Sequence, residues 1–260
     1  MGKPLLSVVV PAYNEVHNLK DGVLVDIYIY LIKQKYDWEV LIVDDGSLDK
    51  TREMVAKYIN NKKGFRLLKE PHRGKGGTVV AGVLAAKGDI ILFTDMDQST
   101  SLNQIENFWL HFGYEPKTGK LLNRKHSADI VIGSRSGREG APLIRKSMAS
   151  GFSILRAIVL KLPYKDTQCG FKAFKKEAAR QIFSRLKVFK EKAVEGAAVT
   201  AGFDLEILYI ARKLNLKVEE VPVVWQHKGS KRVSAVKDSW QGLTDLVKVR
   251  LNALQGKYNV

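Results

Sequence analysis

Cysteine, long apolar runs and repeats are scarce in this sequence. Cys169 is the only cysteine among 260 residues, which excludes a disulfide framework and a cysteine-based zinc site and fits a reducing compartment. No uninterrupted apolar run reaches the roughly 18 residues of a membrane-spanning helix, and no fixed-period repeat indicates a solenoid. No signal peptide is visible, because a predicted strand begins almost at the N-terminus. We therefore expect a protein that is made and kept in the cytosol.

Acidic residues are few relative to basic ones. The chain has 27 Asp and Glu against 43 Lys and Arg, a formal net charge of +16, so we expect an anionic partner. Nucleic acid is the generic candidate, but the basic residues are spread along the chain and form no recognisable binding motif. An anionic membrane surface, together with a phosphate-bearing substrate, accounts for the same charge. We expect the membrane surface and no nucleic acid; a non-enzymatic basic module that binds nucleic acid is the remote alternative.

Predicted strands and helices alternate along the chain, which favours an α/β fold. With 45% hydrophobic residues, 260 residues can bury one full core. We predict strands at residues 5–10, 39–43, 90–93 and 129–133, and helices at about 48–58, 79–86 and 102–112. This alternation implies a mainly parallel sheet with helices on both faces.

Two further segments carry apolar stripes at helical spacing. After a domain at residues 1–235, residues 236–260 are expected to form an amphipathic C-terminal helix. Its apolar stripe holds Trp240, Leu243, Val247, Leu251 and Leu254. Residues 146–162 form a second apolar face, edged by cations that include Arg156. Each segment is expected either to lie in a membrane surface or to pack on the domain, and the sequence leaves both readings open.

Two carboxylates one residue apart follow the apolar run at residues 90–93. Asp95 and Asp97 therefore emerge at the carboxyl end of a buried strand, where open α/β sheets bind ligands. Two hard oxygen ligands suit Mg²⁺ or Mn²⁺, particularly when a nucleotide diphosphate supplies further oxygens. The alternative is a loop in which each aspartate caps a turn or the following helix.

Polar residues also follow the two earlier predicted strands. Pro11 is expected to end the first strand, while Asn14 and Ser47 are expected to be helix N-caps. The glycine-rich segment 73–78 is expected to be a loop that opens a helix and approaches an anion through its N–H groups, with Lys75 adding a point charge. A solvated surface turn is the alternative for this segment. His72, beside it, is expected to be solvated.

These motifs, in this order and at these separations, resemble the family 2 glycosyltransferases. They are Pro11-Ala12-Tyr13-Asn14-Glu15, Val43-Asp44-Asp45-Gly46-Ser47, Arg73-Gly74-Lys75-Gly76-Gly77 and Asp95-Met96-Asp97. Motifs at residues 133–135, 166–172, 203–206 and 221–225 narrow the resemblance to the polyprenyl-phosphate glycosyltransferases. The resemblance spans about residues 5–251 and implies the nucleotide-sugar-binding fold called GT-A.

The resemblance also assigns residues to the nucleotide-sugar donor and to the metal. Donor binding falls to Pro11, Ala12, Tyr13, Glu15, Val43, Asp45, Lys75, Gly76, Asp95, Met96 and Asp97. Asp95 and Asp97, completed by Gln98, should hold Mg²⁺ or Mn²⁺ on the diphosphate. Gln98 departs from the glucosyl relatives, which usually carry glycine there, and from the mannosyl ones, which place glutamine one residue later. The sugar and the base therefore stay open.

The implied acceptor is a phosphate, which changes the catalytic needs. Its second pKa is about 6, so the attacking oxygen is largely ionised and needs cations more than a base. The candidate residues around the acceptor phosphate are Ser134, Arg135, Arg145, Lys228 and Lys231. Asp204 falls where inverting relatives carry their base, Asp166 is a second candidate base, and Asp95 is the third catalytic candidate. Direct displacement would give a β-linked product.

The resulting prediction is an inverting, metal-dependent transfer of a hexose. The expected reaction moves glucose from UDP-glucose to a polyprenyl or dolichyl phosphate, with the enzyme peripheral at the cytosolic membrane face. One alternative is a GDP-mannose-dependent mannosyltransferase, and another is a soluble family 2 transferase that acts on a sugar hydroxyl with Asp204 as its base. Residues 190–202, rich in Ala, Gly and Lys, are either a mobile lid or a neutral insertion.

Overall fold

The structure is a computed structural model. It describes residues 6–123, 127–135, 151, 155–187, 202–226 and 235–258, with only the backbone of residues 235–241. Its helices and strands, in chain order, are β1 (Leu6–Ala12), α1 (Val16–Lys20), α2 (Val23–Leu31), β2 (Trp38–Asp45), α3 (Thr51–Ile59), β3 (Phe65–Glu70), α4 (Gly74–Ala85), β4 (Ile90–Thr94), η1 (Leu102–Ile105), α5 (Glu106–Trp109), β5 (Ile130–Arg135), β6 (Phe171–Lys175), α7 (Lys176–Phe183), α8 (Gly202–Lys213), β7 (Val218–Val223) and α9 (Ala235–Leu254).

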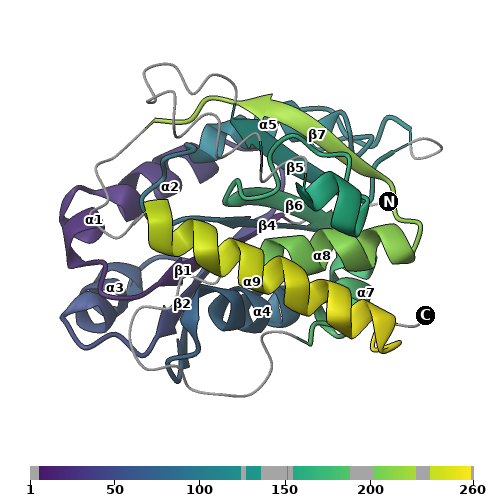
Figure 1. Ribbon diagram of the computed structural model, residues 1–260. Coiled ribbons are helices and arrows are strands. Elements are labelled where there is room, and N and C mark those ends of the chain that lie inside the picture. The colour runs from purple at the N-terminus through teal and green to yellow at the C-terminus, as the bar shows by residue number, and fades with distance from the viewer. Residues whose placement is uncertain are drawn as a thin grey trace.

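Seven strands form one mainly parallel sheet, which confirms the predicted α/β class. Their order is β3-β2-β1-β4-β6-β5-β7. Only β6 runs against its neighbours, pairing antiparallel with both β4 and β5. Helices cover both faces: α2, α3 and α5 contribute to one core cluster, and α4, α7, α8 and α9 to the other. Figure 1 shows α9 crossing the near side of the molecule, in front of the sheet.

Alternation along the central strands creates these two cores. In β1, Val8 and Val10 face one cluster while Val9 faces the other, as the twofold period of a strand requires. Val9 and Val43 then meet Gly82 of α4, where an added Cβ would lie 2.3 Å from Val9 Cγ1 and 2.8 Å from Val43 Cγ2. Any larger residue at 82 would push α4 away from the sheet. The close packing places the start of α4 at the carboxyl end of β2.

Two local predictions were wrong. β1 does not end at Pro11 but continues to Ala12, with Pro11 opposite Val43 of β2. The pairing of β1 with β4 ends at Val9, so beyond it β1 has a strand on one side only, where a missing N–H is tolerated. The glycine-rich segment is not a loop either, because α4 already begins at Gly74.

The predicted C-terminal segment forms α9, which packs on the domain mainly through residues outside the predicted stripe. In α9 the buried side chains are Asp245, Leu246 and Val249, whereas three members of the predicted stripe, Val247, Leu251 and Leu254, are 48%, 50% and 68% exposed. These buried residues recur at one-turn spacing, and α9 packs on α8. They, rather than most of the longer predicted stripe, form the contact with the domain. The side chain of Trp240 lies outside the described residues, as do residues 146–150 and 152–154 of the second segment.

Arg156 in that second segment is buried rather than a cation at the edge of an apolar face. Residues 155–160 are helical, and the Arg156 guanidinium donates to Thr167 Oγ1 at 2.9 Å, so it joins this helix to the loop that precedes β6. Ile158 on the same turn is 70% exposed. Among the helices that the structure describes, none is long and apolar enough to cross a membrane.

A buried carboxylate ties the amino ends of three strands together. Glu39 Oε1 accepts from Ser7 Oγ at 2.6 Å and from the Lys87 N–H at 2.7 Å, and Arg66 donates to Oε2 at 3.1 Å. Burial alone raises the pKa of Glu39, but these hydrogen bonds outweigh it, and the net pKa lies below its ordinary value of 4.5. The ionised group therefore stabilises the fold above that value, and this contribution is lost as the pH falls through the lower folded pKa.

We expect Glu39→Ala to lower the free energy of unfolding by about 2 kcal/mol at pH 7, because three donors lose their acceptor. The difference from wild type should shrink at pH 3, because below about pH 4.5 the unfolded chain gains a proton at Glu39 and the ionised group's contribution to stability falls. Urea unfolding at the two pH values measures both effects. The control is Glu53→Ala on α3, an exposed position, which should change stability by less than about 0.5 kcal/mol. A Glu39→Ala effect no larger than the control, or one independent of pH, would contradict this account.

Candidate functional site

Those predicted site residues that the structure describes gather at one edge of the sheet. The parallel strands β1, β2 and β4 end there, and β6 begins there because it runs the other way. Residues that are far apart in the sequence, such as Asp45, Asp95 and Gly170, therefore share this edge. The contribution of β6 was not predicted, because nothing in its sequence states that it is antiparallel.

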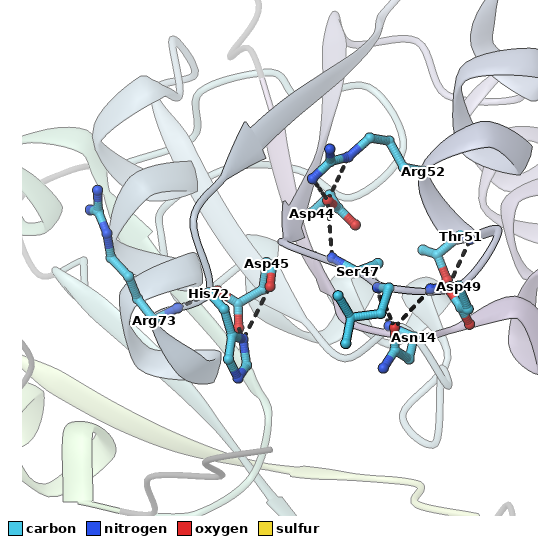
Figure 2. A network of polar contacts seen from close by, with 10 residues as sticks. Asn14, Asp44, Asp45, Ser47, Asp49, Thr51, Arg52, His72 and Arg73 are labelled. Atoms are coloured by element: carbon cyan, nitrogen blue, oxygen red, sulfur yellow. Dashed lines mark hydrogen bonds and ion pairs between the residues drawn. The ribbon is translucent and has the colours of Figure 1, made fainter. Parts of the chain in front are cut away.

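The loops after β1 and β2 hold each other in place, as Figure 2 shows. Asn14 has φ 52 and donates its backbone N–H to Ser47 Oγ at 3.0 Å, while its Oδ1 accepts from the Leu48 N–H at 2.8 Å. Neither Asn14 nor Ser47 is therefore the helix N-cap that the sequence suggested; Glu15 and Lys50 occupy those positions. The two polar side chains bond across the loops instead, which makes the two motifs one unit.

Asp45 at the end of β2 is bound on both carboxylate oxygens. His72 Nδ1 lies 2.8 Å from Oδ2, and the Arg73 N–H donates to Oδ1 at 2.8 Å (Figure 2). The Tyr13 ring stacks on His72, with ring centroids 4.2 Å apart and an interplanar angle of 16°. His72 is therefore not the solvated residue that we expected. The parallel pairing of Asp45 with Glu70 brings the residues after β3 to Asp45, a proximity that local sequence does not reveal.

The start of α4 faces the end of β4. Its first N–H groups receive no side-chain cap, so they remain available to an anion, as expected for this segment. Lys75 Nζ lies 2.5 Å from Asp95 Oδ1, and Gly76 is buried in the same helical turn. Burial alone lowers the pKa of Lys75, but Asp95 and Asp204 outweigh it, so the net shift of the pKa is upward. Lys75 is therefore protonated at neutral pH.

Asp95, Asp97 and Gln98 lie together after β4. Asp97 Oδ1 accepts from the Ser99 N–H at 2.8 Å, so the turn-capping alternative holds for this oxygen. Gln98 has φ 48 and turns its Nε2 back to Asp95 O, at 2.8 Å. Asp95 packs on Gly170, where an added Cβ would lie 2.1 Å from Asp95 Oδ2. Gly170 was not predicted as a site residue, yet any larger side chain there would force the Asp95 carboxylate to move.

This donor set fits a hard divalent ion only in part. Two carboxylates and the amide oxygen of Gln98 are the ligand types that Mg²⁺ and Mn²⁺ prefer. Among the residues that the structure describes, no group of three or more His, Cys, Asp and Glu is arranged to hold a metal ion. Further oxygens would have to come from a bound ligand, as a nucleotide diphosphate provides.

Deeper in the site lies Lys172 of β6, a buried lysine that was not among the predicted site residues. Its side chain is fully buried, and its Nζ donates to Asp204 Oδ1 at 2.6 Å and to Cys169 O at 2.5 Å. Burial raises the pKa of Asp204, and the Lys172 and Lys75 ammonium groups oppose that rise. The available signal was a lysine inside an apolar strand, Phe171-Lys172-Ala173-Phe174.

Arg135 and Asp166 form a second ion pair at this edge. Arg135 Nε and Nη2 donate to the two Asp166 oxygens at 2.6 and 2.8 Å. Burial alone raises the pKa of Asp166, but Arg135 outweighs it, and the net pKa is lowered. With both oxygens engaged and a lowered pKa, Asp166 is a weak base. Ser134 precedes Arg135 in β5 and is half-buried.

The remaining candidates divide into three groups. The side chains of Ala12, Val43 and Met96 are buried in the core, so only their backbone can face a ligand. Pro11 and Glu15 are half-buried, and the Glu15 N–H donates to Thr51 Oγ1 at 2.7 Å. Arg145, Lys228, Lys231 and most of the segment 190–202 lie outside the described residues.

Sequence comparisons place this chain among known transferases. The profile described as "Glycosyl transferase family 2" matches residues 7–183. A dolichyl-phosphate beta-glucosyltransferase of Dictyostelium discoideum is 35% identical over 98% of this chain and 76% of its own length. Proteins of the same name from Saccharomyces cerevisiae and Homo sapiens are 32% and 33% identical, over 97% and 98% of this chain and 76% and 78% of their own lengths.

Solved structures share the fold at low sequence identity. A mannosyltransferase of Pyrobaculum calidifontis, solved with GDP-Man and Mn²⁺, has a TM-score of 0.60 and 19% identity over 97% of this chain, which spans only 65% of that chain. Glucosyl-3-phosphoglycerate synthase of Mycobacterium tuberculosis, solved with Mn²⁺, UDP and glucosyl-3-phosphoglycerate, has a TM-score of 0.61 and 19% identity over 95% of this chain and 80% of its own. These neighbours confirm the predicted GT-A fold.

We expect Lys172→Met to destabilise the protein by about 3 kcal/mol, because it leaves Asp204 as a buried, uncompensated charge. Adding Asp204→Asn should recover part of that loss, and the double-mutant cycle in thermal or urea unfolding measures the coupling. The matched control is Lys175→Met on the same strand, whose partner Asp129 is partly exposed at 3.2 Å; its cost should stay below about 1 kcal/mol. Additive effects of the two substitutions would refute the coupling.

Proposed function

Because this chain belongs to glycosyl transferase family 2, we propose that it transfers glucose from UDP-glucose to a polyprenyl phosphate such as dolichyl phosphate. The observation that carries the proposal is the similarity to dolichyl-phosphate beta-glucosyltransferases over nearly the whole chain. Beyond its similarity, the chain brings Asp95, Lys75 and the open first turn of α4 together at the carboxyl end of β4. Such an arrangement suits a nucleotide diphosphate.

The donor's nucleoside is assigned to the loops after β1, β2 and β3. Tyr13 offers an aromatic face, and Asp45, oriented by His72 and Arg73, offers acceptors to the base or ribose. UDP is preferred because the similar proteins of known name are glucosyltransferases. GDP-mannose is the second candidate, since Gln98 departs from the glucosyl pattern and a structural neighbour was solved with GDP-Man.

Asp95, Asp97 and the Gln98 amide oxygen are the residues that would hold Mg²⁺ or Mn²⁺. When bound, the ion neutralises charge that develops on the departing diphosphate. Lys75 and the N–H groups of α4 add positive charge at the same place. Gly170 leaves the space that the Asp95 carboxylate occupies.

The acceptor phosphate is assigned to the side of the site formed by β5. Arg135 is the described cation there, and Asp166 holds its guanidinium in one orientation. We assign Asp204 an orienting role rather than that of a base, because Lys172 binds one of its oxygens. A phosphate acceptor is already ionised near neutral pH and needs no strong base.

We also propose that the enzyme is peripheral on the cytosolic face of a membrane. Two observations support this placement: the net charge of +16 and the exposed apolar side chains Val247, Leu251 and Leu254 of α9. Basic residues attract an anionic surface while exposed apolar groups enter its interface.

The first test is transfer of labelled glucose from UDP-glucose to a short polyprenyl phosphate with Mg²⁺ or Mn²⁺. Label should appear in lipid, and Asp97→Asn should lower the rate about a hundredfold or more, because the leaving diphosphate loses its cation. Asp89→Asn, an exposed position at the other end of the same strand, should leave the rate unchanged. Release of free glucose without lipid product would redirect the proposal to a soluble acceptor. Absence of turnover with UDP-glucose and GDP-mannose would reject it.

The pH profile of the transfer separates a phosphate acceptor from a sugar hydroxyl. We expect the rate to fall below about pH 6, as the acceptor phosphate takes up its proton, in wild type and in Asp204→Asn alike. The measurement is kcat/KM from pH 5 to 8 for both proteins. If the fall in kcat/KM at low pH disappears in Asp204→Asn, Asp204 acts as a base. That result would support the alternative of a soluble acceptor.

A further inference from the structure

Lys75 and Asp95 form an ion pair at the mouth of the site. The two groups are 2.5 Å apart, with Lys75 27% and Asp95 38% exposed, so the pair borders solvent rather than being sealed in the core. Asp95 is also a carboxylate that the proposed function assigns to the divalent cation. One carboxylate thus has two candidate positive partners, and the structure shows the internal one in place.

Both residues are carried by closely packed backbone. The Asp95 carboxylate lies against Gly170, where an added Cβ would be 2.1 Å from Oδ2. Lys75 lies in the first turn of α4, and Gly82 packs that helix closely against Val9 and Val43 of the sheet. Separation of the pair therefore requires side-chain movement, and the long, flexible Lys75 side chain can move furthest.

Without a bound ligand, Lys75 and a metal ion compete for the Asp95 carboxylate. Three carboxylates, Asp95, Asp97 and Asp204, interact with Lys75, and Lys172 neutralises Asp204 from the far side. A divalent ion placed on Asp95 would lie within a few ångströms of an ammonium group, and like charges so close repel strongly in a partly buried site.

A diphosphate removes the conflict. Its oxygens offer Lys75 a new anionic partner at the start of α4 and also supply the ligands that Asp95 and Asp97 lack. The Lys75 ammonium and the divalent ion then each have an anionic partner, and they no longer compete for the Asp95 carboxylate.

We propose that Lys75 acts as an internal cation on Asp95 in the free enzyme, so that the divalent ion binds tightly only after the donor diphosphate draws the Lys75 ammonium away. The inference rests on the proposed metal-dependent function and deepens it. Lys75 is then a positioning residue that couples metal binding to donor binding, a coupling that must be reciprocal. The free enzyme then binds the metal weakly, so the metal seldom occupies the site unless the donor is also bound.

The test measures Mn²⁺ binding to the protein by calorimetry or by the electron paramagnetic resonance signal of free Mn²⁺, without any turnover. Without nucleotide, Lys75→Met should bind Mn²⁺ about tenfold more tightly than wild type, because the competing cation is gone. Lys75→Arg, which keeps the charge, should stay weak. The control Lys69→Met, at an exposed lysine of neighbouring β3, removes the same charge elsewhere and should leave the affinity unchanged.

Addition of UDP provides the second arm. UDP should raise the Mn²⁺ affinity of wild type more than that of Lys75→Met, since only wild type has a lysine to displace. Thermal unfolding checks that Lys75→Met and Lys75→Gln are folded. If Lys75→Met does not fold, Lys75→Gln takes its place in both arms.

The outcomes separate this inference from the function it rests on. If Mn²⁺ binds with UDP in an Asp97-dependent manner, but both neutral variants match wild type without UDP, the inference is overturned and the proposed metal site stands. If no variant binds Mn²⁺ even with UDP, both are overturned. A gain in Lys75→Met that Asp97→Asn abolishes supports both.

Discussion

The ion pair between Lys172 and Asp204 is the interaction on which the rest of the site depends. It joins β6 to α8 inside the protein, where neither charge could remain without the other. From this pair the charges alternate outward through Lys75 to Asp95, which borders solvent. The deepest part of the site is thus neutralised by a buried pair, whereas the outermost pair, Lys75 with Asp95, borders solvent, where a ligand can reach it. A charged ligand can bind at the rim without exposing a buried charge behind it.

The direction of one strand makes this arrangement possible. Because β6 runs antiparallel to β4, its amino end lies at the edge where the parallel strands end, and Gly170 and Lys172 enter a site otherwise built by β1, β2 and β4. On the opposite side, Gly82 lets α4 approach the sheet so closely that Lys75 reaches Asp95. Two glycines and one reversed strand therefore set the distance between the carboxylates and the cations, and the chemistry of the rim follows from that distance.

Sequence reasoning succeeded where a signal is local and failed where a partner comes from elsewhere in the chain. Alternation of strands and helices was enough for the α/β class, and ordered motifs were enough for the family, which the comparisons confirm. His72 was misjudged because its partners, Asp45 and Tyr13, reach it only through the pairing of β2 with β3 and the loop after β1. For α9 the sequence left domain packing and a membrane surface both open, because helical spacing does not reveal which of two faces α8 covers.

The sequence by itself determined which residue types stand at the ends of which strands, and with them the family and the class of ligand. This information is local, because an apolar run followed by carboxylates or glycines carries the same meaning in any parallel sheet. Only the tertiary structure decided which of these groups neutralise one another: Lys75 with Asp95, Lys172 with Asp204 and Arg135 with Asp166. Charge pairing depends on separations of a few ångströms between residues tens of positions apart, and those separations exist only once the sheet has assembled.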